Sequence, residues 1–350
     1  MRWFWLVAFF AACGDTSSAA PDGSGGDAAP AADAGPDAAP DGATTSGNLG
    51  QVTGEMNLAT CPMGAPAGSM CKQVTVSGCP SIETESIDAT VAILAQTGTL
   101  KGTIVHFSGS GGQGFQTLGT QQYAGAGYQQ VFVAWRADWE QTQSLGIKAA
   151  GCRPSTILKW IFDSVHNGSR ALAFCGEGFS GGSGQLGYAL AQYGMGDYLD
   201  YVNELSGPPF ARIDLGCDGN QPATAMVCNA TDTMRLPASL NRWENVLPPD
   251  SCGATTNSAA TIAKWHDDSI AVGGVYVYPK TQVEFFDCTN NATAVTAMAQ
   301  IYFNLIQQSG STTTHYHCYS QADGCNGEGL GTGNQAAAAA MISGCVPHHQ

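Results

Sequence analysis

The sequence predicts an α/β protein in which a mostly parallel sheet is covered by helices on both faces. Apolar, β-branched runs alternate with segments of helical periodicity from about residue 100 to the C-terminus, as in parallel sheets. These runs are short and nearly continuously apolar, which is typical of buried strands. Beyond residue 50 about 300 residues remain, enough for one large core.

The predicted elements follow in order along the chain. Two partly alternating runs, 70–79 and 86–96, predict antiparallel strands. Further strands are predicted within 101–112, 128–139, 170–179, 198–217 (ending near Ser206), 272–288 (ending at Asp287) and 312–320, and helices over 153–167, 183–194, 292–310 and 334–345. The stretch 218–270, rich in Pro, Asn and Cys, predicts an insertion between two strand–helix units.

Residues 1–13 have the features of an export signal. Arg2 precedes an apolar run too short for a transmembrane helix, and Phe10-Ala11-Ala12-Cys13 is similar to a bacterial lipobox, whose cysteine carries lipid. An ordinary signal peptide cut nearby is the alternative. Residues 14–50 are mainly Ala, Pro, Asp and Gly, so we expect a disordered tether. The folded domain is predicted to span 51–350, anchored by lipid in the cell envelope, at the outer membrane or cell surface.

The net charge and the cysteine content bear on two questions, whether the protein binds nucleic acid and whether its cysteines form disulfides or bind zinc. The net charge is −15 and no basic stripe offsets it, which argues against a nucleic-acid partner. Of the 13 cysteines, all except Cys13 remain after lipidation, an even number that predicts a disulfide framework. The chain contains no C-x-x-C pair, the spacing that would indicate a zinc site. We expect disulfides between the cysteines that are close in the sequence, Cys61–Cys71 and Cys217–Cys228. Cys175 either forms a disulfide as well or is a buried free thiol.

The segment FCGEGFSGGSGQLGYAL places a serine between a predicted strand and a predicted helix. It contains Gly178-Phe179-Ser180-Gly181-Gly182, the G-x-S-x-G pattern of a nucleophile on a strained strand-to-helix turn. Small neighbours are needed there because strand and helix approach closely around the serine. A flexible glycine turn with a structural serine is the alternative.

With this motif the chain resembles the α/β-hydrolase superfamily, in particular secreted serine esterases and lipases, over residues 65–345. GFSGG resembles its nucleophile elbow, VHFSGSGGQGF its first oxyanion-hole loop, and the insertion after the sixth predicted strand its cap. The resemblance implies Ser180 as nucleophile and Asp287, at the end of VEFFD, as the acid that orients a histidine. It also implies an oxyanion hole from the backbone N–H groups of Gly181 and of Ser110 or Gly111. Asp138 and Asp267 are alternative acids.

The histidine that the resemblance implies, besides the serine and the acid, is missing from its expected place in the sequence. The resemblance implies a histidine between the last strand and the last helix, but SQADGCNGEGLGTG contains none. His317 is the nearest candidate base, and His315, on the same face of the strand THYHCY, is the alternative. His266, in the insertion, would reach the serine only by folding over it. A site without a base is the remaining possibility.

These features predict a serine esterase that cleaves a carboxylic ester of an extracellular or periplasmic substrate through an acyl-enzyme. The resemblance implies no metal and no organic cofactor. We expect a monomer that contacts the membrane only through its N-terminal lipid. A catalytically inactive α/β-hydrolase fold that serves as a surface binding module is the alternative, and the histidine-free loop supports it.

Overall fold

The computed structural model describes residues 47–142, 145–218, 228, 236, 239–254, 256–289, 295–311, 314–326 and 329–350. The predicted export signal, Cys13 and the predicted tether as far as residue 46 lie outside the described residues. The last part of the predicted tether, residues 47–50, instead belongs to the folded domain, because Gly47 N donates to Gln192 O at 2.9 Å and Gly50 N to Thr156 Oγ1 at 2.9 Å. Within the described ranges no helix is both long enough and apolar enough to cross a bilayer.

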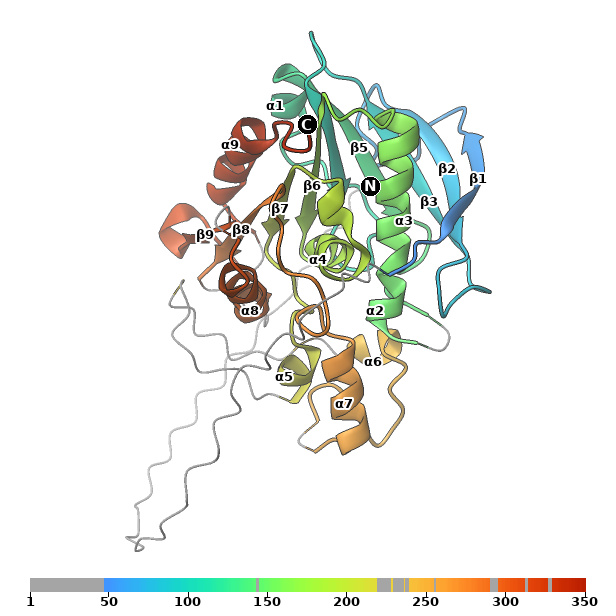
Figure 1. Ribbon diagram of the computed structural model, residues 1–350, viewed down its shortest axis with the longest axis vertical. Helices are drawn as coiled ribbons and strands as arrows, with labels where there is room; N and C mark the ends of the chain where they lie inside the picture. The colour runs from blue at the N-terminus through green and yellow to red at the C-terminus, as the bar shows by residue number, and fades with distance from the viewer. Residues whose placement is uncertain are drawn as a thin grey trace, which may run out of the picture. The chain divides into compact units, whose positions relative to one another are not determined.

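A nine-stranded sheet runs through the described chain in the order β1-β2-β3-β5-β4-β6-β7-β8-β9 (Figure 1). The antiparallel part consists of β1 (Gln51–Asn57), β2 (Met70–Ser77), β3 (Ile87–Leu94) and β5 (Tyr128–Trp135). Parallel to β5 follow β4 (Gly102–Phe107), β6 (Ala173–Phe179), β7 (Tyr201–Leu205), β8 (Gln282–Cys288) and β9 (Thr314–Tyr319). The mostly parallel sheet is therefore confirmed.

Each strand predicted from the sequence is present, and β1 is an addition that the prediction missed. Its residues, QVTGEMN, are mostly exposed at the edge of the sheet, so they lack the apolar run that marks the other strands. Its register with β2 shifts between Val52 and Gly54, as at a β-bulge, a common feature of edge strands.

Helices cover both faces of the sheet. On one face, Ile157 of α3 (Cys152–Trp160), Leu186 of α4 (Gly181–Tyr193) and Met298 of α8 (Val295–Gln308) belong to one buried apolar cluster. On the other face, Tyr123 of α1 (Thr120–Gly125) and Met341 of α9 (Gly333–Gly344) belong to a second cluster. The helix predicted over 153–167 is present as α3 and a π-helical turn that continues it over Ile161–Val165.

The described part of the connection between β7 and β8 contains three short helices: α5 (Ile213–Asp218), α6 (Leu240–Trp243) and α7 (Ala259–Asp267). We call the described part of residues 209–281 the cap. In Figure 1 its helices gather beside α2 (Ile147–Ala150), away from the rest of the helices. The insertion predicted over 218–270 thus falls within this connection.

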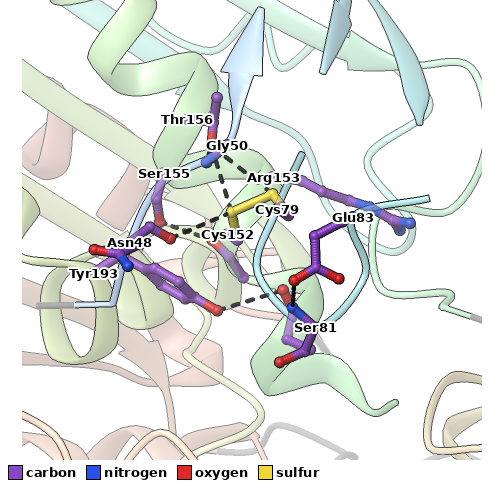
Figure 2. Close-up of a disulfide and its surroundings, with 12 residues drawn as sticks. Asn48, Gly50, Cys79, Ser81, Glu83, Cys152, Arg153, Ser155, Thr156 and Tyr193 are labelled. Atoms are coloured by element: carbon purple, nitrogen blue, oxygen red, sulfur yellow. Dashed lines mark hydrogen bonds between the residues drawn. A yellow bond between two sulfur atoms is a disulfide. The ribbon is translucent and has the colours of Figure 1, made fainter. Parts of the chain in front are cut away.

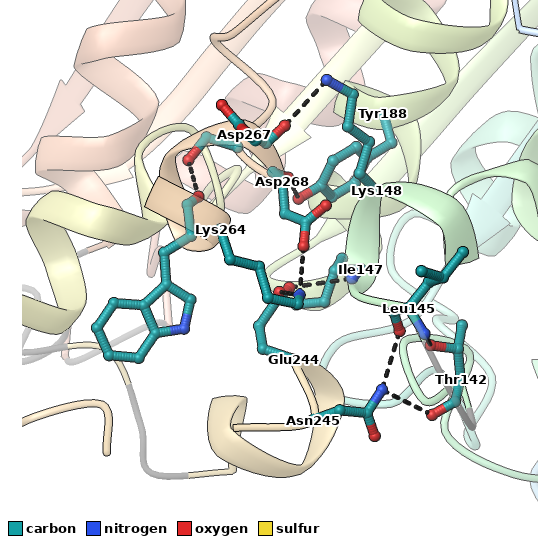
Figure 3. Close-up of polar contacts among 12 residues, drawn as sticks. Thr142, Leu145, Ile147, Lys148, Tyr188, Glu244, Asn245, Lys264, Asp267 and Asp268 are labelled. Atoms are coloured by element: carbon teal, nitrogen blue, oxygen red, sulfur yellow. Dashed lines mark hydrogen bonds and ion pairs between the residues drawn. The ribbon is translucent and has the colours of Figure 1, made fainter. Parts of the chain in front are cut away.

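Polar contacts attach the cap to α2 (Figure 3). One carboxylate oxygen of Glu244 accepts the backbone N–H of Ile147 at 3.0 Å, and the other accepts Lys264 Nζ at 2.5 Å. Lys148 Nζ donates to the carbonyl oxygen of Asp267 at 3.0 Å. Burial, with Asp268 nearby, raises the pKa of Glu244 to about 8. This carboxyl therefore titrates near neutral pH at the junction of cap and core.

All cysteines other than Cys13 are joined in six disulfides. The predicted pair Cys61–Cys71 is confirmed. The predicted pair Cys217–Cys228 is wrong, because Cys217 bonds to Cys252 and Cys228 to Cys318. The cysteine nearest along the chain is not the nearest in the fold.

Two further disulfides join segments that are distant in the sequence. Cys175 is bonded to Cys345, so it is not the free thiol considered from the sequence. Cys79 is bonded to Cys152 at the start of α3, and Thr156 of the same helix lies beside this disulfide (Figure 2). Six disulfides indicate folding in an oxidising compartment outside the cytoplasm.

Candidate active site

Ser180 lies on a sharp turn between β6 and α4. Its backbone angles are φ 52° and ψ −114°, a region that residues with a side chain rarely adopt. Its N–H donates to the carbonyl oxygen of Leu205 on β7 at 2.8 Å, which helps to hold the turn. The turn therefore has the strained geometry that the G-x-S-x-G motif predicts.

The glycines around Ser180 are required by close packing. A methyl group added at Gly178 would lie 2.6 Å from the backbone N of Ser183, and one at Gly182 would lie 2.6 Å from the carbonyl carbon of Phe107. One at Gly181 would lie 2.8 Å from the backbone N of Ser110. These separations are too short for real atoms, so the glycines allow strand, helix and the loop after β4 to meet.

The loop after β4 lies against the start of α4. Ser110 in this loop has a φ of 51°, and the loop is held by bonds from Trp139 N to Gly111 O and from Trp135 N to Gly112 O. Within the described chain the N–H groups of Ser110, Gly111 and Gly181 donate to no other group. These are the groups predicted to form an oxyanion hole, and they are available to an acceptor from outside the chain.

A cavity of about 370 Å³ opens beside Ser180, and Ser110, Gly111 and Gly181 line it too. Its apolar wall comes mainly from the cap, and it includes Pro209, Phe210, Leu236 and Trp243. The titratable side chains among the described lining residues are those of Asp138, Glu140 and Arg242. Nowhere in the described chain do three or more His, Cys, Asp or Glu side chains gather as metal ligands.

Asp138 joins the cap to the loop after β4. Its carboxylate forms an ion pair with Arg242 of α6 and accepts Trp243 Nε1 at 3.4 Å. The same carboxylate lies against Gly111, since a methyl group there would be 2.7 Å from the Asp138 Cγ. Asp138, predicted as an alternative acid, thus lies in the cavity and is paired with an arginine.

Glu140 is the second carboxyl group of the cavity, and it was not among the candidate residues predicted from the sequence. It is fully buried, and neither of its side-chain oxygens has a hydrogen-bond partner within the described chain. Burial raises the pKa of Glu140 well above its usual range, and the nearby charge of Asp138 adds to the rise. The sequence did contain a signal that could have identified Glu140. Asp138 and Glu140 follow the C-terminal end of β5, and α/β folds place their sites at the C-terminal ends of their strands.

Asp287 lies near the end of β8, as predicted, and its side chain is fully buried. It accepts the hydroxyl of Tyr316 at 2.6 Å. Glu204 on β7 is also fully buried, and burial together with the charge of Asp287 raises the pKa of Glu204 well above its usual range. Asp287 is not among the described residues that line the Ser180 cavity.

His317 lies on β9, where its Nε2 is 2.8 Å from a carboxylate oxygen of Glu284 and its ring stacks on Phe286. Side chains alternate along a strand, so His317 points to the opposite face of the sheet from Tyr316, the partner of Asp287. His315 shares the face of His317 and is exposed. The structure therefore does not bring His317 or His315 together with Asp287.

The remaining histidines also lie away from Ser180. The described residues include all seven histidines of the chain, and none of them lines the Ser180 cavity. His266, in the cap, is 3.2 Å from its neighbour Asp267, the other alternative acid. His106 is buried 3.2 Å from Glu177. The cavity thus has a strained serine turn and uncommitted backbone N–H groups beside it, but no imidazole among its described walls.

Solved structures similar to this chain include esterases. A rice cell wall-degrading esterase from Xanthomonas oryzae is 12% identical, with a TM-score of 0.51 over 84% of this chain and 97% of that one. A bacterial heroin esterase is 10% identical, with a TM-score of 0.50 over 80% of this chain and 85% of that one. The sequence matches no protein-family model and no curated protein. At these identities the likeness shows the fold, and the chain has the predicted α/β-hydrolase fold.

Proposed function

We propose that the protein is a serine-dependent carboxylic ester hydrolase that works through an acyl-enzyme. The observation that carries the proposal is the strained turn of Ser180 beside the uncommitted N–H groups of Ser110, Gly111 and Gly181, all on one cavity. Strain of this kind persists only where surrounding structure maintains it, and it gathers at functional sites.

The chemistry that this arrangement supports is acyl transfer. Ser180 Oγ attacks the ester carbonyl carbon, and the N–H groups of the oxyanion loop stabilise the negative oxygen that forms. The bond from carbon to the alcohol oxygen then breaks, and the proton from Ser180 passes through a base to that oxygen. Water attacks the resulting acyl-serine, which releases the carboxylic acid and restores the serine hydroxyl.

For the base we propose Glu140. It lines the Ser180 cavity, its carboxylate oxygens are otherwise uncommitted within the described chain, and its raised pKa favours proton uptake. His317 with Asp287, chosen from the sequence, remains the competing assignment. Because the pKa of Glu140 is raised, the ionised form that can act as a base becomes more abundant with rising pH, and esterase activity should rise as well.

A fluorophosphonate probe tests the nucleophile and the base together. Ser180→Ala should abolish covalent labelling, whereas Ser164→Ala, a change at an exposed serine outside the cavity, should leave it unchanged. Glu140→Gln should slow labelling and 4-nitrophenyl acetate hydrolysis by about 10²-fold, while His317→Gln should not. If the folded His317 variant loses activity and the Glu140 variant keeps it, His317 is the base.

A surface binding module is the second candidate function, favoured by the absence of any histidine from the described cavity walls. The same probe separates the two functions. A wild-type protein that is folded yet unlabelled, and that releases no nitrophenol, would support the binding module.

The location is part of the proposal. We propose that Cys13 carries lipid and that the predicted tether, from residue 14 to the start of the domain, holds the domain at the cell envelope, where its ester substrate is extracellular or periplasmic. The six disulfides support a compartment outside the cytoplasm. Mass spectrometry of the mature N-terminus would test the lipid, since Cys13→Ala should leave the chain unlipidated.

A further inference from the structure

A second cavity, of about 690 Å³, lies at the N-terminal ends of the parallel strands, the opposite end from Ser180. Arg170, just before β6, and Lys280, just before β8, line it, so it is at the N-terminal ends of these parallel strands. Ser180 follows the C-terminal end of β6. The described residues that line this cavity include none that line the Ser180 cavity, so the two sites are separate.

Arg170 has an unusual environment in this cavity. Its guanidinium lies over the rings of Phe162 and Tyr198, 4.7 and 5.1 Å from their centroids. Its Nη1 is buried, and within the described chain it has no hydrogen-bond partner. Leaving such a group unpaired costs free energy, so an acceptor from outside the chain would stabilise it.

Other arginines of the described chain differ from Arg170. The guanidinium groups of Arg153, Arg212 and Arg242 each form an ion pair with a carboxylate. No such ion pair involves Arg170 within the described chain. In a protein of net charge −15, where carboxylates outnumber cations, a part-buried arginine without one is a candidate anion site.

Lys280 adds a second positive charge to this cavity, and His349 lines it as well. Burial lowers the pKa of His349, and the positive charges of Arg170 and Lys280 lower it further, so its imidazole adds no positive charge at neutral pH. Lys280 is exposed and can move its ammonium toward a bound anion.

Two carboxylates oppose this charge. Asp197 lines the cavity but is exposed to water, which screens its charge. Asp200 is buried nearby and accepts three backbone N–H groups, those of Phe174, His348 and His349. Asp200 is thus committed to the backbone, whereas Arg170 lines the cavity, is half-buried and forms no ion pair within the described chain.

The rest of the described wall is largely apolar. Leu190, Val275, Val277 and Pro279 line it, and Val277 is 50% exposed although it is a large hydrophobic residue. A fixed guanidinium beside an aliphatic wall suits a ligand with one anionic end and one apolar end. We propose that this cavity binds a monocarboxylate with an apolar chain, its carboxylate on Arg170 and Lys280 and its chain along Val275 and Val277.

Calorimetric titration of the full chain with octanoate tests the proposal. Arg170→Gln should weaken octanoate binding by about tenfold or more, the effect of losing a charge-assisted hydrogen bond. Arg136→Gln removes the same charge from an exposed position outside the cavity and should change nothing. Octanamide, which has the same chain without the charge, should bind more weakly to the wild type than octanoate does.

Three further variants keep the test decisive if Arg170→Gln disturbs the rings beneath it. Lys280→Gln and Val277→Asp alter exposed positions, and each should weaken octanoate binding. Arg242→Gln alters the Ser180 cavity and should leave binding unchanged. The proposal is overturned if wild type binds no octanoate, if Arg170, Lys280 and Val277 variants all bind it normally, or if Arg242→Gln alone weakens it.

Discussion

Replacing Gly181 with alanine is the sharpest test of how the Ser180 turn and the loop after β4, the proposed oxyanion loop, fit together. The new methyl group would lie 2.8 Å from the backbone N of Ser110 and closer still to the Ser110 carbonyl oxygen, whereas ordinary contacts begin near 3.4 Å. Relieving this overlap requires a shift of about 1 Å between the loop and the start of α4.

The shift should reduce both activity and stability. Misplacing an oxyanion donor by about 1 Å costs about 10²-fold in rate. Overpacking of this kind costs about 1–3 kcal/mol of unfolding free energy. In a domain of this size that lowers the melting temperature by about 2–6 °C.

Fluorophosphonate labelling rate and thermal unfolding, measured on the same samples, give the two readouts. Gly114→Ala is the matched control, because it lies in the same loop and a methyl group there would have nothing within 4 Å. We expect the control to behave as wild type. If Gly181→Ala also labels and melts as wild type does, the close approach of Ser110 and Gly181 is refuted.

Two further predictions concern stability. Cys79–Cys152 spans 73 residues and Cys61–Cys71 spans 10, so loop entropy predicts losses of about 4.4 and about 2.7 kcal/mol when each pair is replaced by alanine. Thermal unfolding should show the larger drop for Cys79–Cys152, and equal drops would contradict the entropic account. Burial raises the pKa of Glu244 to about 8, so the folded state holds a proton that the unfolded state releases above about pH 4.5. The contribution of Glu244 to stability should therefore fall as pH rises from about 5 to 8, and Glu244→Gln should flatten the melting-temperature profile in that window; an unchanged slope would refute it.

Local patterns in the sequence were sufficient for most of the fold. Buried strands such as 101–112 and 170–179 are apolar runs bounded by glycine or polar residues, and their signal lies within the run itself. The sharp turn at Ser180 could be predicted as well, because its glycines and the flanking strand and helix are neighbours in the chain. The exposed strand β1 had no such signal, since it forms by pairing with the edge of β2.

The disulfide pairing, the direction of His317 and the lining of the Ser180 cavity depend on contacts between residues that are distant in the sequence. Cys217 bonds to Cys252 rather than to Cys228 because the fold of the cap brings Cys217 and Cys252 together. His317 stands in the right part of the sequence, but the alternation of β9 turns it toward Glu284. Glu140 and Arg242 meet in the Ser180 cavity only because the cap packs on the loop after β5. The sequence alone therefore determined most of the sheet and the strained turn at Ser180, which depend on local patterns, whereas tertiary packing decided which side chains share the cavity.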